Sequence, residues 1–397
     1  RVEAAYKVEI VAGRDVDGEV NTSQADRPLS GTGGQGTIEA GNISIFAHGN
    51  VTGDITAARG LRIVSGGAVL SLISFVPDED VEHISSIQAY GGFAGDLDSN
   101  GDIRLRSWGD INGGSVVGRN VDLFTGGTFS GAILALGIAA VEAWGGLDGV
   151  TISLGSIVAR THGEITGRLD AAYDIAATAH GDIAASADIQ AGERMAIDTG
   201  GVMRADLIAG QRVEVDARAF AAGASVMSAN DQVDVAVLEA ISGAQFVGPA
   251  GVTILAGGDV DAYVETHQAD AVTSITSRTG VSDLDFKTPQ GQVDVVAMGA
   301  VAMAQQASEV PEAMAPKSIS VTAFGAVAAS SLLAHESLDL TALSNDSGPA
   351  TIAVLDARTL GAEADINLFA MDAIVGQYAA TGDLSATSLQ DITGSYT

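Results

Sequence analysis

The chain has 397 residues, and its composition excludes several classes of protein. It contains 50 glycines and no cysteine, so a disulfide scaffold and a cysteine-based zinc or iron–sulfur site are excluded. A net charge of -31 disfavours binding to nucleic acid and to anionic membranes. No apolar run reaches the length of a membrane-spanning helix, so we expect no membrane insertion.

The first part of the chain predicts one strand followed by irregular segments. Tyr6–Ile10 alternates between polar and apolar residues, as a strand does. Asp15–Gly36 is rich in glycine, serine and aspartate and has no periodicity, which predicts a lateral loop. Ser74–Glu82 combines a proline with several acidic residues and predicts a second lateral loop, after which the pattern resumes near Ile84.

From residue 41 onward the sequence repeats, and the clearest steps between copies are 18 to 20 residues. Each copy starts an alternating stretch with an apolar residue. These starts are Ile43, Leu61, Ile103, Val121, Ala139, Ile157, Ile175, Met195, Val213, Val233 and Val252. Weaker starts with irregular gaps follow at Val293, Ile319, Leu338, Ile366 and Leu384.

Further columns keep a fixed distance from these starts. Six residues on, turn glycines recur at Gly49, Gly67, Gly109, Gly127, Gly145, Gly163, Gly181 and Gly201. Two residues later, apolar side chains recur at Val51, Val69, Ile111, Phe129, Leu147, Ile165, Ile183 and Met203. A weaker column, twelve residues from the start, includes Ile133 and Leu169 but also Ser115, Thr151 and Ala187. Glycine at a fixed corner indicates a backbone with positive φ or no room for a side chain.

Short strands, a corner glycine and a return after about 19 residues predict an all-β fold, a parallel β-solenoid with apolar side chains stacked inside. We expect it to be right-handed. The prediction is one elongated domain over residues 1–397, of roughly 17 to 20 coils. Met303–Lys317 predicts a third lateral excursion, a short helix or loop limited by its prolines.

The residue before the turn glycine is histidine, tryptophan or glycine, and such variation is typical of an exposed corner. This corner includes Trp108, Trp144, His162 and His180, besides His48 and several glycines. An exposed row of side chains is the expected reading. Two alternatives are a metal held by stacked imidazoles and a surface on which the tryptophans stack against sugar rings. These four residues are therefore the candidates for ligand or partner contact.

Carboxylate pairs raise the alternative of a polysaccharide lyase or hydrolase, since parallel β-helices host such enzymes. The pairs are Asp96 with Asp98, Asp259 with Asp261, and Asp283 with Asp285. None has a lysine or arginine evidently placed beside it, and no nucleophile elbow, phosphate loop or zinc-protease motif occurs. We therefore expect acidic edges that keep the solenoid soluble, and no catalytic residue.

Glycine–aspartate turns make calcium the one candidate cofactor, because carboxylate and carbonyl oxygens are its preferred ligands. The candidate ligands are Asp54, Asp102, Asp110, Asp182 and Asp259. The denser glycine–aspartate pattern of calcium-binding β-rolls is absent, so we expect no cofactor that the fold requires.

The coil length, the turn glycines and the stretch Gly41–Val69 (GNISIFAHGNVTGDITAARGLRIVSGGAV) resemble the repeat region of filamentous-haemagglutinin-type adhesins. The resemblance covers about Gly41–Val260. That family consists of large secreted bacterial proteins built as right-handed parallel β-helices. The resemblance implies an extracellular location at the cell surface, adhesion and fibre formation, and it supplies no catalytic residue.

The expected function is thus a non-enzymatic structural rod, either the subunit of a surface fibre or the shaft of an adhesin. The segment Gly382–Gly394 still has the coil pattern, which predicts an uncapped end that pairs with further strands. The partner is then another copy stacked end to end, or the continuation of a longer chain. A carbohydrate-binding adhesin that recognises cell-surface glycans is one alternative, and a polysaccharide-cleaving enzyme is the other.

Overall fold

The computed structural model describes residues 2–4, 7–22, 42–57, 60–75, 84–305, 315–344 and 348–397. These residues form strands and turns, with no helix among them, and hence no helix that could span a membrane. The chain forms two compact units, Arg1–Gly192 and Glu193–Thr397. Both are parallel β-solenoids with coils of about 19 residues, which confirms the predicted fold class. The single domain over residues 1–397 and the right-handed winding of the solenoid stay predictions.

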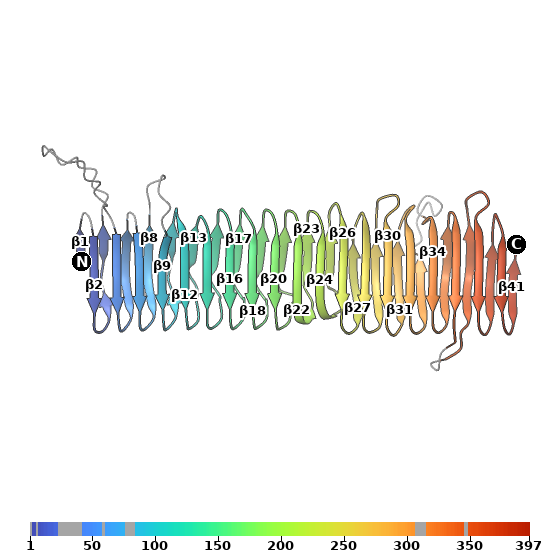
Figure 1. Ribbon diagram of the computed structural model, residues 1–397, viewed down its shortest axis with the longest axis horizontal. Helices are drawn as coiled ribbons and strands as arrows, with labels where there is room; N and C mark the ends of the chain where they lie inside the picture. The colour runs from blue at the N-terminus through green and yellow to red at the C-terminus, as the bar shows by residue number, and fades with distance from the viewer. Residues whose placement is uncertain are drawn as a thin grey trace. The chain divides into compact units, whose positions relative to one another are not determined.

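Each coil of the first unit has a first side, where the repeat begins, and a second side, where the chain returns (Figure 1). The strands of the first side are β2 (Lys7–Ala12), β5 (Asn42–Ala47), β7 (Gly60–Ser65), β9 (Ile84–Ala89), β12 (Asp102–Ser107), β14 (Val121–Thr125), β16 (Ala139–Ala143), β18 (Ile157–Thr161) and β20 (Ile175–Ala179). The other strands are β1 (Val2–Ala4), β3 (Val16–Asp17), β4 (Val20–Thr22), β6 (Val51–Ala57), β8 (Val69–Phe75), β10 (Phe93–Ala94), β11 (Leu97–Ser99), β13 (Ser115–Gly118), β15 (Ala132–Ala135), β17 (Val150–Ser153), β19 (Arg168–Ala171) and β21 (Asp188–Ala191).

The second unit repeats this plan with longer strands on the second side. Its first side consists of β22 (Met195–Met203), β24 (Val213–Phe220), β26 (Gln232–Val237), β28 (Gly251–Ala256), β30 (Val272–Ser277), β32 (Gln292–Ala297), β34 (Ser318–Ala323), β36 (Ser337–Ala342), β38 (Asp365–Ala370) and β40 (Leu384–Ser388). Its second side consists of β23 (Asp206–Ala209), β25 (Ser225–Ser228), β27 (Ile241–Val247), β29 (Val260–Glu265), β31 (Val281–Lys287), β33 (Val301–Gln305), β35 (Val327–Ala334), β37 (Ile352–Thr359), β39 (Ile374–Ala379) and β41 (Ile392–Tyr396).

The pairing register confirms the predicted repeat within each unit. Val121 lies beside Ile103 on one side and Ala139 on the other, and each pair is joined by backbone hydrogen bonds between coils. In the second unit the irregular starts are in register as well: Val293 pairs with Ile319, and the column continues through Leu338, Ile366 and Leu384. The inward side chains of these strands are buried and form the narrow core of each unit.

The first column has members that an apolar pattern does not reveal. Ser85, not Ile84, is the inward residue of β9, where it pairs with Ile103, and Thr273 pairs with Val252 and Val293. Both side chains are fully buried. The Thr273 hydroxyl lies 3.2 Å from the Thr288 hydroxyl, so its burial is compensated by a hydrogen bond.

The weaker column of the sequence was placed wrongly at two coils. Ile133 pairs with Val116 instead of Ser115, and Leu169 pairs with Ile189 instead of Ala187. The coils before these strands contain inserted turn residues, including Gly113 and Gly114 with left-handed backbone. An insertion on the outside of the turn leaves the buried position apolar but changes its distance from the coil start.

The predicted lateral excursions begin later than expected. Asp15–Gly36 was predicted as a loop, but Val16–Asp17 and Val20–Thr22 are strands that pair with β6. Similarly, residues 74–75 complete β8 and residues 303–305 complete β33. Residues 315–317 of the third predicted excursion are described and are not helical. The remaining residues, 23–36, 76–82 and 306–314, lie outside the described residues. β3 and β4 were not predicted, because they are short strands within a polar segment and give too few alternating residues for a strand pattern.

The turn glycines are required because successive coils approach closely at the corner. A Cβ at Gly109 would lie 2.3 Å from the carbonyl oxygen of Gly91, and one at Gly163 would lie 2.5 Å from that of Gly145. No turn glycine of the predicted column has a left-handed backbone, so the lack of space, and not positive φ, selects glycine. Gly201 differs, because it lies inside β22 where the register with β24 shifts.

Asparagine and aspartate side chains bridge successive coils beside these glycines. The Asp110 carboxylate accepts a hydrogen bond of 2.8 Å from the Thr128 amide, one coil later. The same bridge joins Asn50 to the Ala68 amide at 2.8 Å and Asn120 to the Ile138 amide at 2.9 Å. A Cβ on the intervening residue, Gly127, would lie 2.0 Å from the Asp110 carboxylate oxygen. Glycine and the bridging side chain therefore form one device.

This device predicts non-additive substitutions. Asp110→Ala should lower the free energy of unfolding by about 1 kcal/mol, because the Thr128 amide loses its partner. Gly127→Ala should cost more in the native chain than in the Asp110→Ala variant, where the added methyl group no longer meets the carboxylate. Thermal and urea denaturation of the single and double variants measure this coupling.

Gly163→Ala is the matched control, since its obstacle is the backbone of Gly145. Its cost should be the same with or without Asp110. Strict additivity of Asp110→Ala and Gly127→Ala would contradict the coupling.

Candidate functional site

The corner of the first unit carries a continuous row of aromatic rings, which we call the aromatic row. Two members were not recognised in the sequence: Tyr90, stacked on Trp108 with ring centroids 5.0 Å apart, and Phe124, which lies edge-on between Trp108 and Trp144. The row continues from Trp144 to His162, whose ring centroids are 6.0 Å apart, and ends at His180. Its members are Tyr90, Trp108, Phe124, Trp144, His162 and His180. Ring spacing of this size is favourable for aromatic pairs.

The rings of this row cover part of each other, which limits what they can bind. Tyr90 and Trp108 are nearly parallel, at 18°, so these two faces are already in contact. Trp144 is different, because Phe124 meets it at 80° and His162 at 56°. Trp144 is 60% exposed and Trp108 is 49% exposed. The row therefore offers apolar ring edges along the coils, and Trp144 is more exposed than Tyr90 and Trp108.

The two predicted histidines lie on successive coils, as their spacing indicated. The rings of His162 and His180 stack with centroids 4.6 Å apart. A metal site needs further ligands pointing to a common centre. Within the ranges that the structure describes, no group of three or more histidine, aspartate or glutamate side chains could hold a metal ion. Ring stacking is thus the interaction that these two residues make.

The candidate calcium ligands take part in several different contacts. Asp110 bridges to the next coil, and Asp102 accepts hydrogen bonds from Arg119 at 3.0 Å and from Asn120 at 2.9 Å. Asp182 also has a partner, whereas Asp54 is exposed on β6 and Asp259 borders a hollow near Arg278. These side chains lie on different coils and do not converge. Calcium binding stays a prediction without support from this geometry.

The second unit has a polar hollow of about 520 Å³ on its second side, which we call the acidic hollow. It brings together Asp261 of β29 with Asp283 and Asp285 of β31, because Asp261 pairs with Asp283 across the two strands. The predicted pair Asp283 and Asp285 is therefore part of one site. Asp259 is not, because it lies before β29 at another corner. The predicted pair at Asp96 is used differently, since Asp96 accepts a 2.8 Å hydrogen bond from the Ser115 amide.

A basic residue does lie next to these acids, contrary to the sequence-based expectation. Lys287 follows Asp285 on the same face of β31, and its ammonium group is 2.5 Å from the Glu265 carboxylate. The Tyr263 hydroxyl donates a 2.9 Å hydrogen bond to the same carboxylate. The pairing was not evident in the sequence because Glu265 and Lys287 are 22 residues apart and meet only when β29 and β31 are in register.

The hollow sets the pKa values of its groups in opposite directions. Burial raises the pKa of Asp285, and the charges of Asp283 and Asp261 raise it further. Burial also raises the pKa of Glu265, but hydrogen bonds from Lys287 and Tyr263 outweigh it, and the net pKa is lowered. Burial and the bond to Glu265 raise the pKa of Tyr263. The result is an acidic group with a raised pKa beside an ion pair, an arrangement also found in general acid–base sites.

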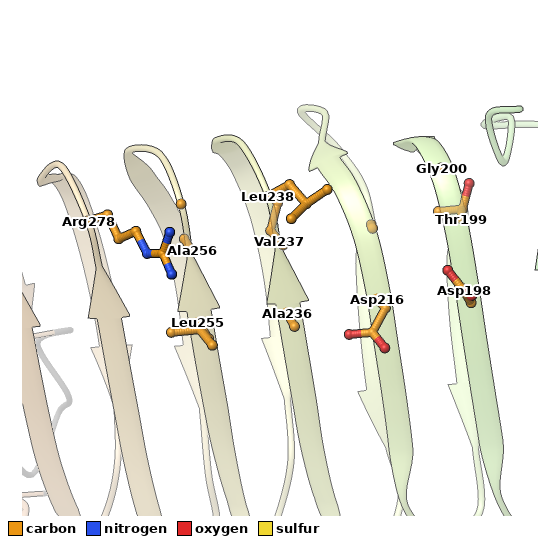
Figure 2. Close-up of a pocket in the computed structure, with 12 residues that line it drawn as sticks. Asp198, Thr199, Gly200, Asp216, Ala236, Val237, Leu238, Leu255, Ala256 and Arg278 are labelled. Carbon is orange, nitrogen blue, oxygen red and sulfur yellow. The ribbon is translucent and has the colours of Figure 1, made fainter. Parts of the chain in front are cut away.

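A second hollow of the second unit, of about 360 Å³, lies at the end of its first side (Figure 2). Leu238 and Leu255 form its apolar part. Asp198 and Asp216 border it at one end and Arg278 at the other. Nothing in the sequence pattern singled out this group, because its five residues come from five different coils.

Comparisons with known proteins found no relative of this chain. No protein-family model matches the chain, and no match was found among curated proteins or solved structures. The parallel β-solenoid is therefore established by the structure alone, and the filamentous-haemagglutinin resemblance stays a proposal.

The acidic hollow predicts a stabilising substitution. Because the pKa of Asp285 is raised on folding, the folded state binds more protons than the unfolded state between the ordinary aspartate pKa and the raised value. Stability should therefore fall as the pH rises through that window. Asp285→Asn should remove this fall in stability with pH. It should stabilise the protein at pH 7 by about 0.5 kcal/mol, because the carboxylates of Asp261 and Asp283 are no longer repelled by a third one.

Denaturant unfolding between pH 4 and pH 8 tests this sign. Asp206→Asn, at an exposed position of β23, is the control and should leave the pH dependence nearly unchanged. A less stable Asp285→Asn variant at pH 7 would show that the ionised carboxylate makes a favourable contact instead.

Proposed function

We propose that this protein is a non-enzymatic structural shaft, secreted by a bacterium and displayed outside the cell as part of a surface fibre or adhesin. The observation that carries the proposal is the parallel backbone pairing between successive coils within each unit. For example, the amides of Val121, Ala139 and Ile157 each donate to a carbonyl group of the following coil at 2.9 to 3.0 Å. Such a ladder resists stretching, because extension must break many hydrogen bonds.

The surface supports the same role. The net charge of -31 keeps repeated strands soluble, and many of the basic side chains pair with acids on the next coil. Arg104 and Arg106, for instance, both contact Asp122 of the following coil, at 3.2 and 2.7 Å. The repeat resembles that of filamentous-haemagglutinin-type adhesins, which are extracellular fibres. Our proposal places the protein in a similar role.

The shaft would extend by adding strands in the same register. β40 pairs with β38, and β41 pairs with β39. Among the described residues no further strand pairs with their other edges, which in our proposal accept further parallel strands. These strands belong, in our proposal, either to another copy stacked end to end or to further coils of a longer chain.

Negative-stain electron microscopy tests the shaft proposal. We expect straight particles whose length corresponds to stacked coils about 4.8 Å apart, singly or joined into fibres. Treatment with a calcium chelator should leave them intact. Globular particles without a long axis would contradict the proposal, and fibres that dissolve with the chelator would show calcium at the joints.

A second candidate function is glycan binding along the aromatic row, favoured by the exposure of Trp108 and Trp144. Sugar rings stack on accessible aromatic faces, and Trp144 offers one. In this proposal the shaft also serves as an adhesin for cell-surface carbohydrate. The acidic hollow favours the polysaccharide-cleaving alternative in one respect, its adjoining carboxylates, although the Lys287 ammonium group is held by Glu265.

Binding to an array of glycans distinguishes these possibilities. Replacing Trp108 and Trp144 together with alanine should weaken any glycan binding roughly tenfold, while Tyr173→Ala, at a different exposed corner, should not. Equal binding by both variants would exclude the aromatic row as the site. Shortening of a bound glycan on incubation would instead support the enzyme alternative.

A further inference from the structure

The hollow in Figure 2 has unpaired charges at both ends of an apolar surface. Leu238 is 80% exposed and Leu255 is 50% exposed, so the hollow presents apolar surface to water. Within the described part of the chain, the side chains of Asp198, Asp216 and Arg278 make no hydrogen bond or ion pair.

Among the described arginines of the second unit, Arg278 differs in having no such partner, whereas acidic side chains without one, such as Asp206 and Glu214, occur elsewhere in the unit. In the same unit, Arg212 lies 2.7 Å from Asp234, and Arg218 lies 2.8 Å from Glu239. Arg278 is directed instead toward Ala256 and Leu255, as Figure 2 shows. Arg278 also borders a neighbouring hollow with Asp259, but no ion pair joins the two side chains. An arginine without a partner at one end of an apolar surface, with two carboxylates at the other end, can be satisfied by a second surface of matching charge.

The order of the groups along the coils is the key observation. The pairing register places Asp198 on β22, Asp216 on β24, Ala236 on β26 and Leu255 on β28 in one outward column. Leu238 directly follows β26 and Arg278 directly follows β30. The acidic end and the basic end thus lie two coils to either side of β26, about 10 Å each way.

We propose that this face binds the same face of a second copy of the chain, in an antiparallel pair with a two-fold axis at β26. Under such an axis β22 of one copy lies opposite β30 of the other. The column of Asp198 has Thr276 as its member on β30, two residues before Arg278, so the long Arg278 side chain reaches the other copy's Asp198, and this ion pair forms twice, once on each side of the axis. Asp216 lies one coil from the same guanidinium group. Leu238 of the two copies meets at the axis, and Leu255 covers its flanks.

Self-complementarity of this kind is the requirement for a closed two-fold interface. A single chain carries both members of each ion pair and the apolar centre between them. Pairing would remove the exposed leucines from water and supply the missing partners of three charges. The proposal does not depend on the proposed shaft function, because it concerns contacts between the sides of the coils and not their ends.

Charge reversal tests the ion pairs. Arg278→Asp should weaken dimerisation roughly hundredfold, because the symmetric pair loses two ion pairs and gains two repulsions. The double variant Asp198→Arg with Arg278→Asp should restore the dimer, since the opposite charges meet again. Sedimentation velocity between 1 and 100 µM measures each association, and Arg160→Asp, in the first unit, controls for the change in net charge.

A single introduced cysteine tests the position of the axis, because the native chain has none. Leu238→Cys should form a disulfide between two copies when an added oxidant removes two electrons and two protons from the thiols. Ala196→Cys, exposed on β22 of the same side, should not, since the two copies of that residue would lie about four coils apart, roughly 19 Å.

The outcomes decide the proposal. A protein that stays monomeric throughout this concentration range overturns it. So does a dimer that is unaffected by Arg278→Asp, or one in which both cysteine variants crosslink equally. Rescue by the double charge reversal, together with crosslinking at position 238 alone, establishes the antiparallel pair and rules out misfolding of the single variants.

Discussion

The backbone hydrogen bonds between coils constrain everything else in this protein. Each coil must return to the same register, so that amide and carbonyl groups of the strands meet those of the next coil. Buried polar backbone that misses its partner is costly, so neither the path nor the length of a coil can vary freely. Side chains inside then stack in columns, one residue per coil, and most of them are apolar. Variation is confined to the outside, where turns accept insertions and the surface carries charge.

The corner shows how this constraint selects residues. Successive backbones approach so closely there that a Cβ at Gly127 would overlap the Asp110 carboxylate. The same carboxylate holds the amide of Thr128, so one position requires a small residue and its neighbour a bridging one. Inside the corner, hydroxyl groups serve the carbonyls that the turn leaves free: Thr125 donates to the carbonyl oxygen of Gly109 at 2.7 Å. Of the Gly–Asp turns that suggested calcium, the one at Asp110 carries such a bridge.

Much of the fold could be predicted because a column repeated many times is visible in one sequence. The starts at Ile103, Val121 and Ala139 are in register, and so are the irregular ones at Ile319 and Leu338. Buried polar members of the column, such as Ser85 and Thr273, could not be predicted, because a polar residue in an apolar column looks like a break in the pattern. The sites were less predictable. The contact of Glu265 with Lys287, and the hollow bordered by Asp198 and Arg278, depend on the register between distant residues. They also depend on the direction in which the long side chains point.

The central claim is that successive coils stack in parallel and in register, and spin labels test it directly. Ala140 pairs with Val158, which pairs with Ala176, so cysteines introduced at 140 and 176 lie two coils apart. Labels on these two positions should be about 10 Å apart and show strong dipolar broadening. Labels at 140 and 158 should show stronger broadening still. Absence of broadening in the folded protein at both pairs would contradict the stacked coil, and with it the shaft and the paired face built on it.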